Sequence, residues 1–246
     1  MKRLRMFAGP NGAGKSTVFD KLDKVYDFGI YLNAAEIEKK IKKDGGFSIA
    51  EWGIEAYEAR HFHEFILNHS LRAKLESAGF AIDLELVDGE IRNLNNNTNS
   101  YEVSILTDFI RQILIDRGDN LSFETVMSHE SEIKTLKKSK ELGFGNYLYY
   151  VGTSSPEINK SRVLERVSCG GHPVKPEKIE SCYYDSLSLL IEAIPYTYRT
   201  FTFDNSGENV TLVLEIFEGK QVTLMSENTP NWVETYFLNL IQKSAY

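Results

Sequence analysis

The phosphate-binding pattern G-x-x-x-x-G-K-[ST] at residues 9–16 constrains this chain more than any other feature, because it directly follows a short apolar strand at residues 4–8. Glycines let backbone N–H groups curl around phosphate oxygens, since a Cβ atom would block both the positive φ angles and the close approach. The helix expected after the pattern directs its positive end at the anion. The predicted nucleotide-binding residues are Gly9, Pro10, Asn11, Gly12, Ala13, Gly14, Lys15, Ser16 and Thr17.

Two side chains of this set carry the expected chemistry. Lys15 is expected to reach the β- and γ-phosphates, and Ser16 to hold Mg²⁺ through its hydroxyl. A glycine-rich turn without a ligand is the alternative. The strand before the pattern and the amphipathic run at residues 17–25 after it argue against that alternative.

Composition and charge exclude several classes of protein. The chain has 246 residues, 42% of them hydrophobic, which suffices for one large domain or a core with a substantial insertion. Its net charge of −7 and pI near 5.4 provide no global positive field, so nucleic acid is not favoured as a partner. Only two cysteines occur, Cys169 and Cys182, which indicates free thiols in a reducing compartment. No signal peptide and no apolar run near the roughly 18 residues of a membrane helix is visible, so we expect a cytoplasmic protein without a membrane partner.

The order of the apolar segments predicts an α/β fold. Strands are expected at residues 4–8, 30–33, 121–125, 147–151 and 200–203, and helices at residues 17–25, 34–43, 101–117, 130–142, 157–167 and 177–193. Alternation of this kind produces a mostly parallel sheet with helical crossovers. We therefore expect a single domain over residues 1–246, a three-layer sandwich of the phosphate-loop NTPase or kinase type.

Three further segments interrupt or extend this core. Residues 52–67 repeat apolar groups at helical spacing and predict a long helix. Residues 80–94 place apolar runs on both sides of Asp88-Gly89, the signal of a two-residue hairpin, so residues 69–100 are interpreted as an insertion. Residues 207–246 predict a C-terminal hairpin, turning at residues 218–220, and an amphipathic helix at residues 232–241.

Five segments carry a resemblance to a known family. They are residues 9–17, 31–37 (Y-L-N-A-A-E-I), 122–129 (S-F-E-T-V-M-S-H), 162–172 (R-V-L-E-R-V-S-C-G-G-H) and 204–206 (D-N-S). Together they resemble the zeta-toxin-like family of phosphate-loop kinases over most of residues 3–206 outside the insertion. The resemblance implies a kinase that uses ATP or GTP with Mg²⁺ to phosphorylate a hydroxyl of a small acceptor, such as a nucleotide sugar. It also implies a small antitoxin protein as a partner.

Two positions depart from the family pattern. After the second strand the family has Asn-Ala-Asp-Glu, and the resemblance identifies its Asp as the base that takes the acceptor's proton. This chain has Ala35 there, and a methyl group cannot accept a proton. The family also tends to carry an Arg before paired aromatic residues, where this chain has Cys182. Ala35 marks either a natural variant with weakened or redirected chemistry or a deliberate replacement that silences the enzyme.

The candidate catalytic residues are Lys15, Glu124, Arg162, Arg166 and the position of Ala35. Arg162 and Arg166 stand at i and i+4 on one helical face. With the family resemblance they predict a lid over residues 159–183 that closes cations over the transferring phosphate, and a solvated charged face is the alternative. Glu124 ends a strand at the carboxyl edge of the expected sheet, where it would orient metal-bound water or the acceptor hydroxyl. A helix-capping acid is the alternative interpretation of Glu124.

The candidate acceptor-binding residues are Asn33, Glu36 and Thr125. Glu36 is also the one local carboxylate that could replace the missing base, but consecutive helix positions diverge by about 100°. His172 and the Asp204-Asn205-Ser206 turn are weaker candidates for nucleotide contact, with capping and an ordinary Asx turn as alternatives.

Three functions remain open from the sequence. The first is a small-molecule or nucleotide-sugar kinase impaired by Ala35. The second is a pseudo-kinase, a regulatory module that binds a nucleotide without transferring phosphate. The third is a polynucleotide 5′-hydroxyl kinase, against which the acidic net charge counts.

Overall fold

The computed structural model describes residues 1–171 and 173–238. The chain groups into two units, one formed by Met1–Gly29 with Ser122–Tyr246 and the other by Ile30–Leu121. The segment 69–100, interpreted from the sequence as an insertion into a single domain, lies inside the second unit, which extends beyond it on both sides. Among the described residues, no helix is both long and apolar enough to traverse a bilayer.

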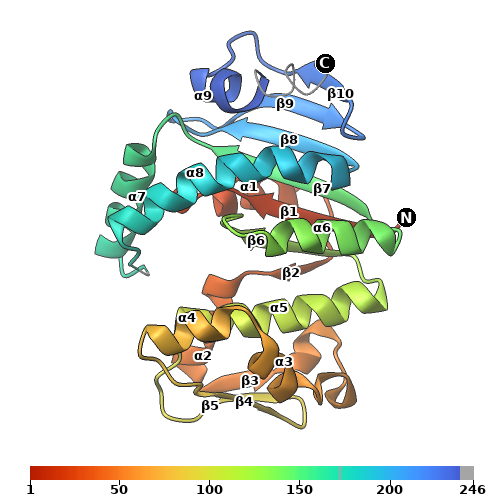
Figure 1. The fold of residues 1–246 in the computed structure, drawn as a ribbon, viewed down its shortest axis with the longest axis vertical. Helices are drawn as coiled ribbons and strands as arrows, with labels where there is room; N and C mark the ends of the chain where they lie inside the picture. The colour runs from red at the N-terminus through yellow and green to blue at the C-terminus, as the bar shows by residue number, and fades with distance from the viewer. Residues whose placement is uncertain (172, 239–246) are drawn as a thin grey trace. The chain divides into compact units, whose positions relative to one another are not determined.

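A mixed, mostly parallel sheet forms the centre of the first unit (Figure 1). Its strands lie in the order β10-β9-β8-β7-β1-β6. Their bounds are β1 (Arg3–Ala8), β6 (Leu121–Thr125), β7 (Gly145–Gly152), β8 (Arg199–Asp204), β9 (Thr211–Phe217) and β10 (Gln221–Leu224). β1 pairs in parallel with β7, and β7 with β8, whereas β8, β9 and β10 are antiparallel neighbours. The predicted α/β class and the C-terminal hairpin are confirmed.

Helices cover both faces of this sheet. They are α1 (Lys15–Asp23), α6 (Ser131–Glu141), α7 (Pro156–Ser168), α8 (Pro176–Ala193) and the 3₁₀ turn η3 (Ile194–Tyr196). Phe7 of β1 packs edge-on against Phe19 of α1, with ring centroids 5.2 Å apart, and stacks on Tyr149 of β7. The next residue, Tyr150, points to the other face and accepts a hydrogen bond from the Ser186 hydroxyl of α8 at 3.2 Å. α1 and α8 therefore lie on opposite faces, as the predicted three-layer sandwich requires.

The C-terminal helix begins one residue before its predicted start. It consists of α9 (Asn231–Val233) and the π-helical turn η4 (Glu234–Leu238), and residues 239–241 of the prediction lie outside the described residues. Trp232 anchors the segment, because its Nε1 donates to Asp204 Oδ1 at 2.7 Å. A Cβ atom on Gly152 would lie 2.4 Å from the Trp232 ring, so the ring packs directly against the end of β7.

The second unit contains a small antiparallel sheet in the order β3-β5-β4. In chain order, the elements of the whole unit are β2 (Ile30–Leu32), α2 (Ala34–Asp44), β3 (Gly46–Ser48), η1 (Ile49–Trp52), η2 (Ala56–Ala59), α3 (Phe62–Asn68), α4 (Leu71–Ser77), β4 (Leu84–Val87), β5 (Glu90–Asn93) and α5 (Ser100–Arg117). The predicted hairpin at residues 80–94 is confirmed, with Asp88 and Gly89 at φ angles of 52° and 81°, the positive values of its turn type. β3 was not predicted, because a three-residue strand after a helix end carries no periodic signal.

The long helix predicted at residues 52–67 is wrong. Gly53 adopts φ 64°, the left-handed conformation that ends the short turn η1. A new turn then starts, since the Glu58 carboxylate accepts a hydrogen bond from the Glu55 N–H at 2.7 Å. The true helix α3 begins only at Phe62, which is buried together with Ile66. Local capping therefore overrides the apolar spacing on which the prediction rested.

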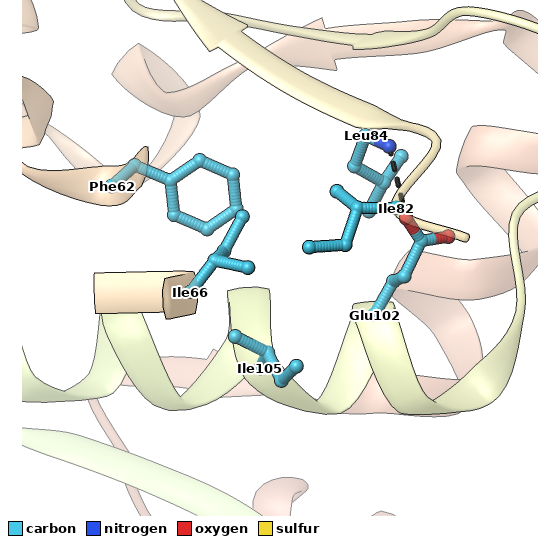
Figure 2. A pocket seen from close by; sticks show the side chains of 6 residues that line it. All are labelled: Phe62, Ile66, Ile82, Leu84, Glu102 and Ile105. Atoms are coloured by element: carbon cyan, nitrogen blue, oxygen red, sulfur yellow. Dashed lines mark hydrogen bonds between the residues drawn. The ribbon is translucent and has the colours of Figure 1, made fainter. Parts of the chain in front are cut away.

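A buried carboxylate organises the second unit (Figure 2). Glu102 of α5 accepts hydrogen bonds from the backbone N–H groups of Asp83 and Leu84 and from Asn99 Nδ2, the last at 3.0 Å. Burial raises the pKa of Glu102, although the backbone donors oppose the shift. The adjoining cavity has a volume of about 10 Å³, which suits at most one water molecule. This cavity is therefore not a small-molecule site.

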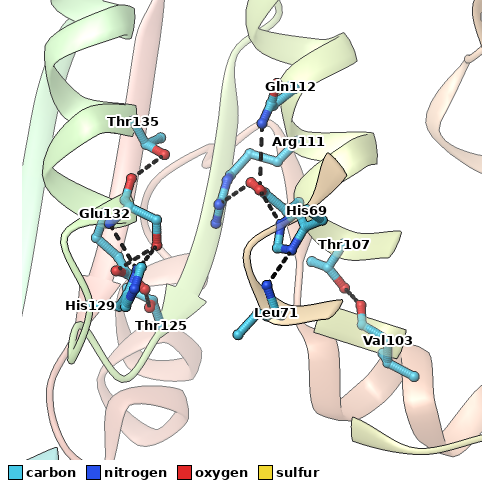
Figure 3. Close-up of polar contacts among 12 residues, drawn as sticks. His69, Leu71, Val103, Thr107, Arg111, Gln112, Thr125, His129, Glu132 and Thr135 are labelled. Atoms are coloured by element: carbon cyan, nitrogen blue, oxygen red, sulfur yellow. Dashed lines mark hydrogen bonds and ion pairs between the residues drawn. The ribbon is translucent and has the colours of Figure 1, made fainter. Parts of the chain in front are cut away.

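A second polar cluster joins α5 to the start of α4 (Figure 3). His69 Nδ1 accepts a hydrogen bond from the Leu71 N–H at 3.1 Å, so its Nε2 is the nitrogen that donates to Asp108 Oδ2, also at 3.1 Å. Arg111 and Gln112 donate to the same carboxylate. Burial opposes ionisation, but Arg111 and His69 outweigh it and lower the pKa of Asp108 to about 2. The His69–Asp108 pair has a structural role, because both ring nitrogens of His69 already take part in hydrogen bonds within the protein.

We expect Asp108→Asn to remove a pH-dependent part of this unit's stability. The folded chain binds fewer protons at Asp108 than the unfolded chain, so the stabilisation is complete above the ordinary Asp pKa and is lost as the pH falls towards about 2. The difference in free energy of unfolding between wild type and variant should shrink by about 2 kcal/mol between about pH 6 and about pH 2. Urea unfolding followed by Trp52 fluorescence in a Trp232→Phe background measures it. The exposed control Asp44→Asn should show no such shrinkage, and a pH-independent difference for Asp108→Asn would contradict the assignment.

Candidate functional site

The residues 9–14 form a loop between β1 and α1, as the phosphate-binding pattern predicts. Gly14 stands before the first turn of α1 at φ 93°, and Gly9 adopts φ 141°. A Cβ atom on Gly9 would lie 2.1 Å from the Val151 carbonyl oxygen, so only glycine fits there. The loop closes on itself through a hydrogen bond from the Ala13 N–H to the Pro10 carbonyl at 3.2 Å. Backbone contacts within the protein therefore help to fix the conformation of this loop.

Lys15 turns its ammonium back onto this loop. Its Nζ donates to the carbonyls of Gly9 at 2.9 Å and Pro10 at 3.2 Å. Burial lowers the pKa of Lys15, Glu124 opposes the shift and Arg166 adds to it. Glu124 and Arg166 therefore both lie within electrostatic range of the Lys15 ammonium. Three of the predicted catalytic residues are thus brought together in one unit.

Ser16 and Glu124 meet at the carboxyl end of β6. The Ser16 hydroxyl donates to Glu124 Oε2 at 3.1 Å. Hydroxyl and carboxylate oxygens are the hard ligands that Mg²⁺ takes in nucleotide sites, where phosphates and water complete its coordination. The described part of the chain holds no group of three His, Cys, Asp or Glu side chains that could bind a metal ion by itself. The pair therefore fits Mg²⁺ brought by a nucleotide better than a resident metal.

Thr125 is the last residue of β6, directly before the turn that contains Met127 (Figure 3). Its hydroxyl donates to Glu132 Oε1 at 2.8 Å and accepts a hydrogen bond from the Met127 N–H at 3.1 Å. Met127 is fully buried with a φ of 55°, an uncommon angle for a residue other than glycine. The hydrogen bond from the Met127 N–H to the Thr125 hydroxyl stabilises the turn at Met127. Glu132, which the sequence reasoning did not single out, holds Thr125 in place.

The two candidate lid arginines differ in their surroundings. Both lie on α7, and Arg162 donates from Nη1 to the Asn205 carbonyl at 2.7 Å and from Nη2 to the Gly207 carbonyl at 3.2 Å. Arg166 is exposed and acts on Lys15 through its charge. Of the predicted lid, residues 159–171 and 173–183 are described, and His172 lies outside the described residues.

The position that departs from the family pattern on α8 is apolar and enclosed. Cys182 is buried, and its thiol donates to the Ser128 hydroxyl at 3.5 Å. The next residue, Tyr183, donates from its hydroxyl to the Thr153 carbonyl at 2.7 Å. Neither contact replaces the positive charge of the arginine that the family pattern has at this position.

The candidate acceptor-binding residues Asn33 and Glu36, and Ala35 at the position of the family base, belong to the second unit. Asn33 caps α2, because its Oδ1 accepts from the N–H groups of Ala35 at 3.0 Å and Glu36 at 3.4 Å. Its Nδ2 donates to the Tyr31 hydroxyl at 3.0 Å. Ala35 and Glu36 are exposed. Asn33 therefore has a capping role that the sequence reasoning missed, although Asn before a helical run is the usual cap signal.

Comparisons with known proteins give one short sequence match and several fold matches. No family model matches the chain. An uncharacterized protein of Haemophilus influenzae is 37% identical over 60 residues, which are 24% of this chain and 43% of that protein. The chain thus spans less than half the length of this curated relative, and the match carries no function.

Solved structures share the fold at low sequence identity. A chain of the AvrRxo1-ORF1:AvrRxo1-ORF2 complex crystallised with sulphate ions matches with a TM-score of 0.54 and 15% identity, over 99% of this chain and 63% of that one. A crystal of the same pair with ATP gives a TM-score of 0.52 and 14% identity, with the same coverage. A chain of the PezAT toxin-antitoxin system of Streptococcus pneumoniae gives 0.49 and 13%, over 100% of this chain and 88% of that one. The first two matches establish the fold.

Proposed function

We propose that this chain is a phosphotransferase of the zeta-toxin-like family, which uses ATP or GTP to phosphorylate a hydroxyl of a small acceptor such as a nucleotide sugar. The observation that carries the proposal is the 3.1 Å pairing of the Ser16 hydroxyl with the Glu124 carboxylate, next to Lys15 on the glycine loop. A glycine turn with a purely structural role does not require a hydroxyl, a carboxylate and an ammonium beside it. The fold likeness to a chain that was crystallised with ATP supports the same assignment.

Phosphoryl transfer needs positioning and charge neutralisation more than covalent chemistry. In the proposed mechanism the loop N–H groups hold the phosphates, and the Lys15 ammonium exchanges its two carbonyl partners for phosphate oxygens. Ser16 and Glu124 would hold Mg²⁺, which neutralises charge on the phosphate oxygens when bound. Arg166 adds positive charge on the side of Lys15. The low polarity that lowers the Lys15 pKa also strengthens each of these attractions.

Ala35 favours a second candidate function. The residue at this position is exposed on the first turn of α2 and carries no proton acceptor. A chain that binds ATP without transferring its phosphate would be a nucleotide-dependent regulatory module. The chain's acidic net charge of −7 counts against the alternative of a polynucleotide kinase.

Transfer of labelled phosphate tests the proposal. The wild-type chain and Ala35→Asp are each incubated with γ-labelled ATP or GTP, Mg²⁺ and a panel of nucleotide sugars, nucleosides and oligonucleotides. A labelled nucleotide sugar or other small hydroxyl compound supports the kinase. Nucleotide binding without transfer by either chain supports the regulatory module, and the absence of nucleotide binding contradicts both.

Arg166→Ala and Arg162→Ala should each slow phosphoryl transfer more than they weaken nucleotide binding. Arginines that approach the transferring phosphate act mainly on charge in the transition state, so we expect kcat to fall by about 10²-fold in each variant. Kd should change by less than about threefold in Arg166→Ala, and by less than kcat in Arg162→Ala, because Arg162 also donates to the Asn205 carbonyl. The assay uses the Ala35→Asp background and calorimetry for Kd. Lys160→Ala, which removes a cation on the same helix that pairs with Glu180 at 2.6 Å, is the control. Full turnover in either arginine variant would assign that arginine to the solvated face.

The proposal also includes a partner and a location. A kinase of this type acts on cytoplasmic metabolites, and a small antitoxin protein would keep it in check. Co-expression with the neighbouring open reading frame, followed by size-exclusion chromatography, tests for a stable complex. A neighbouring product that neither co-elutes with the chain nor slows transfer argues against this partner.

A further inference from the structure

Two asparagine side chains donate to backbone carbonyls of the phosphate loop. Asn159 of α7 is fully buried and donates from Nδ2 to the Asn11 carbonyl at 2.7 Å. Asn205, directly after β8, donates from Nδ2 to the Ala13 carbonyl at 2.8 Å. These two carbonyls are different from those of Gly9 and Pro10, which accept hydrogen bonds from Lys15.

Each contact sets the orientation of one peptide plane. In a trans peptide the C=O group and the N–H of the next residue point in opposite directions. Holding the Asn11 carbonyl toward Asn159 therefore turns the Gly12 N–H away from it, and the Ala13 contact does the same for the Gly14 N–H. A phosphate-binding loop presents such N–H groups to its anion. The loop is thus oriented before a ligand arrives, which removes an ordering cost from binding.

Close packing explains the glycines at these places. A Cβ atom on Gly12 would lie 2.5 Å from the Asn159 carbonyl oxygen, and one on Gly14 would lie 2.3 Å from Asn205 Nδ2. Both glycines also have positive φ angles, 79° and 93°. Glycine here therefore admits the asparagine contacts as well as the turn.

The two asparagines are themselves held by neighbours. The Thr153 hydroxyl donates to Asn159 Oδ1, and the Thr153 carbonyl accepts from the Tyr183 hydroxyl of α8. The Asn205 carbonyl accepts from Arg162 of α7. A chain of hydrogen bonds thus connects the helices of the predicted lid to the Asn11 and Ala13 carbonyls of the loop.

We propose that Asn159 and Asn205 are positioning residues for nucleotide binding, which hold the N–H groups of Gly12 and Gly14 toward the phosphates. The inference rests on the proposed function, because it takes a nucleotide phosphate as the ligand of the loop. It adds two residues, outside the loop itself, that determine nucleotide affinity.

Asn159→Asp tests the proposal with one matched control. The variant keeps the size and the oxygen that accepts from Thr153, but replaces the donor to the Asn11 carbonyl with an oxygen. Asn146 of β7 is the control, because it is equally buried, donates to the Leu136 carbonyl at 2.7 Å and accepts from the Ser139 hydroxyl. It stands near the start of β7, whereas the loop follows the other end of the neighbouring strand β1.

Calorimetry with ATP and GTP and thermal unfolding are measured for wild type, Asn159→Asp and Asn146→Asp. We expect Asn159→Asp to weaken nucleotide binding about tenfold or more. Asn146→Asp should lower the unfolding temperature about as much as Asn159→Asp does, but it should leave nucleotide binding unchanged. Asn205→Ala, on a half-buried turn, should also weaken binding about tenfold and keeps the test valid if Asn159→Asp fails to fold. If every variant that folds binds nucleotide as tightly as wild type, the positioning role of the asparagines is overturned and the proposed function is not. If the wild-type chain binds neither ATP nor GTP, both the positioning role and the proposed function are overturned.

The pH dependence separates positioning from stability. The carboxyl group that Asn159→Asp introduces is buried and faces a carbonyl oxygen, so its pKa is raised, and its protonated form can donate to that carbonyl. In this variant the affinity for ATP should therefore recover partly between about pH 8 and about pH 5.5, while the wild type and Asn146→Asp show no such recovery. A loss of affinity in Asn159→Asp that is the same at every pH, and that tracks its loss of stability, would overturn the positioning role.

Discussion

Ala35→Asp is expected to raise the rate of phosphoryl transfer by about 10²–10⁴-fold, the contribution of a well-placed general base. Position 35 is exposed on the first turn of α2, where Asn33 caps the helix through two hydrogen bonds to its backbone. An added carboxylate there therefore changes the chemistry of the surface without disturbing a packed core. A negative charge at this helix start is also favourable for the fold.

Single-turnover transfer of labelled phosphate measures the gain, and calorimetry should show unchanged nucleotide affinity, because the base acts on the acceptor hydroxyl. Ala34→Asp is the matched control, since it adds the same charge to the same helix turn but about 100° around the axis. Glu124→Gln should abolish the gain, because Glu124 is proposed to position Mg²⁺ or the acceptor in either background. Equal rates for Ala34→Asp, Ala35→Asp and wild type with every acceptor would mean that another group is the base or that the chain is no kinase.

Lys15→Ala is expected to weaken ATP binding by about 10²-fold, because it removes the ammonium that reaches the phosphates from within the loop. The same ammonium donates to the Gly9 and Pro10 carbonyls, so the loop also loses two hydrogen bonds. The fold should survive, since Ala13 still closes the loop through its N–H and the asparagine contacts remain.

Calorimetry with ATP and Mg²⁺ provides the measurement, with thermal unfolding to show that the variant is folded. Lys21→Ala, which removes an exposed cation on the same helix α1, is the control and should bind as tightly as wild type. An unchanged affinity in Lys15→Ala would remove the basis for the nucleotide site.

The elements that sequence reasoning predicted well are those in which the deciding residues are close together in the chain. The strand, glycine loop and helix over residues 3–23 follow from one contiguous pattern, and Asp88-Gly89 specify their hairpin by local φ angles alone. The helix expected at residues 52–67 is wrong because local capping residues outweigh the apolar spacing. Gly53 ends one turn in a left-handed conformation, and the Glu58 carboxylate accepts from the Glu55 N–H at the start of the next turn.

The candidate site divides in the same way. The glycine pattern alone predicts a loop that can hold a phosphate, because the glycines, Lys15 and Ser16 need only their fixed spacing and the helix that follows them. The side chains that surround that loop, in contrast, come from distant parts of the chain and follow from the packing of strands and helices. Glu124 meets Ser16 across 108 positions, and Asn159 and Asn205 reach the loop carbonyls across 148 and 192. Contacts at such separations depend on how strands and helices pack, and no local pattern of residue types encodes that packing.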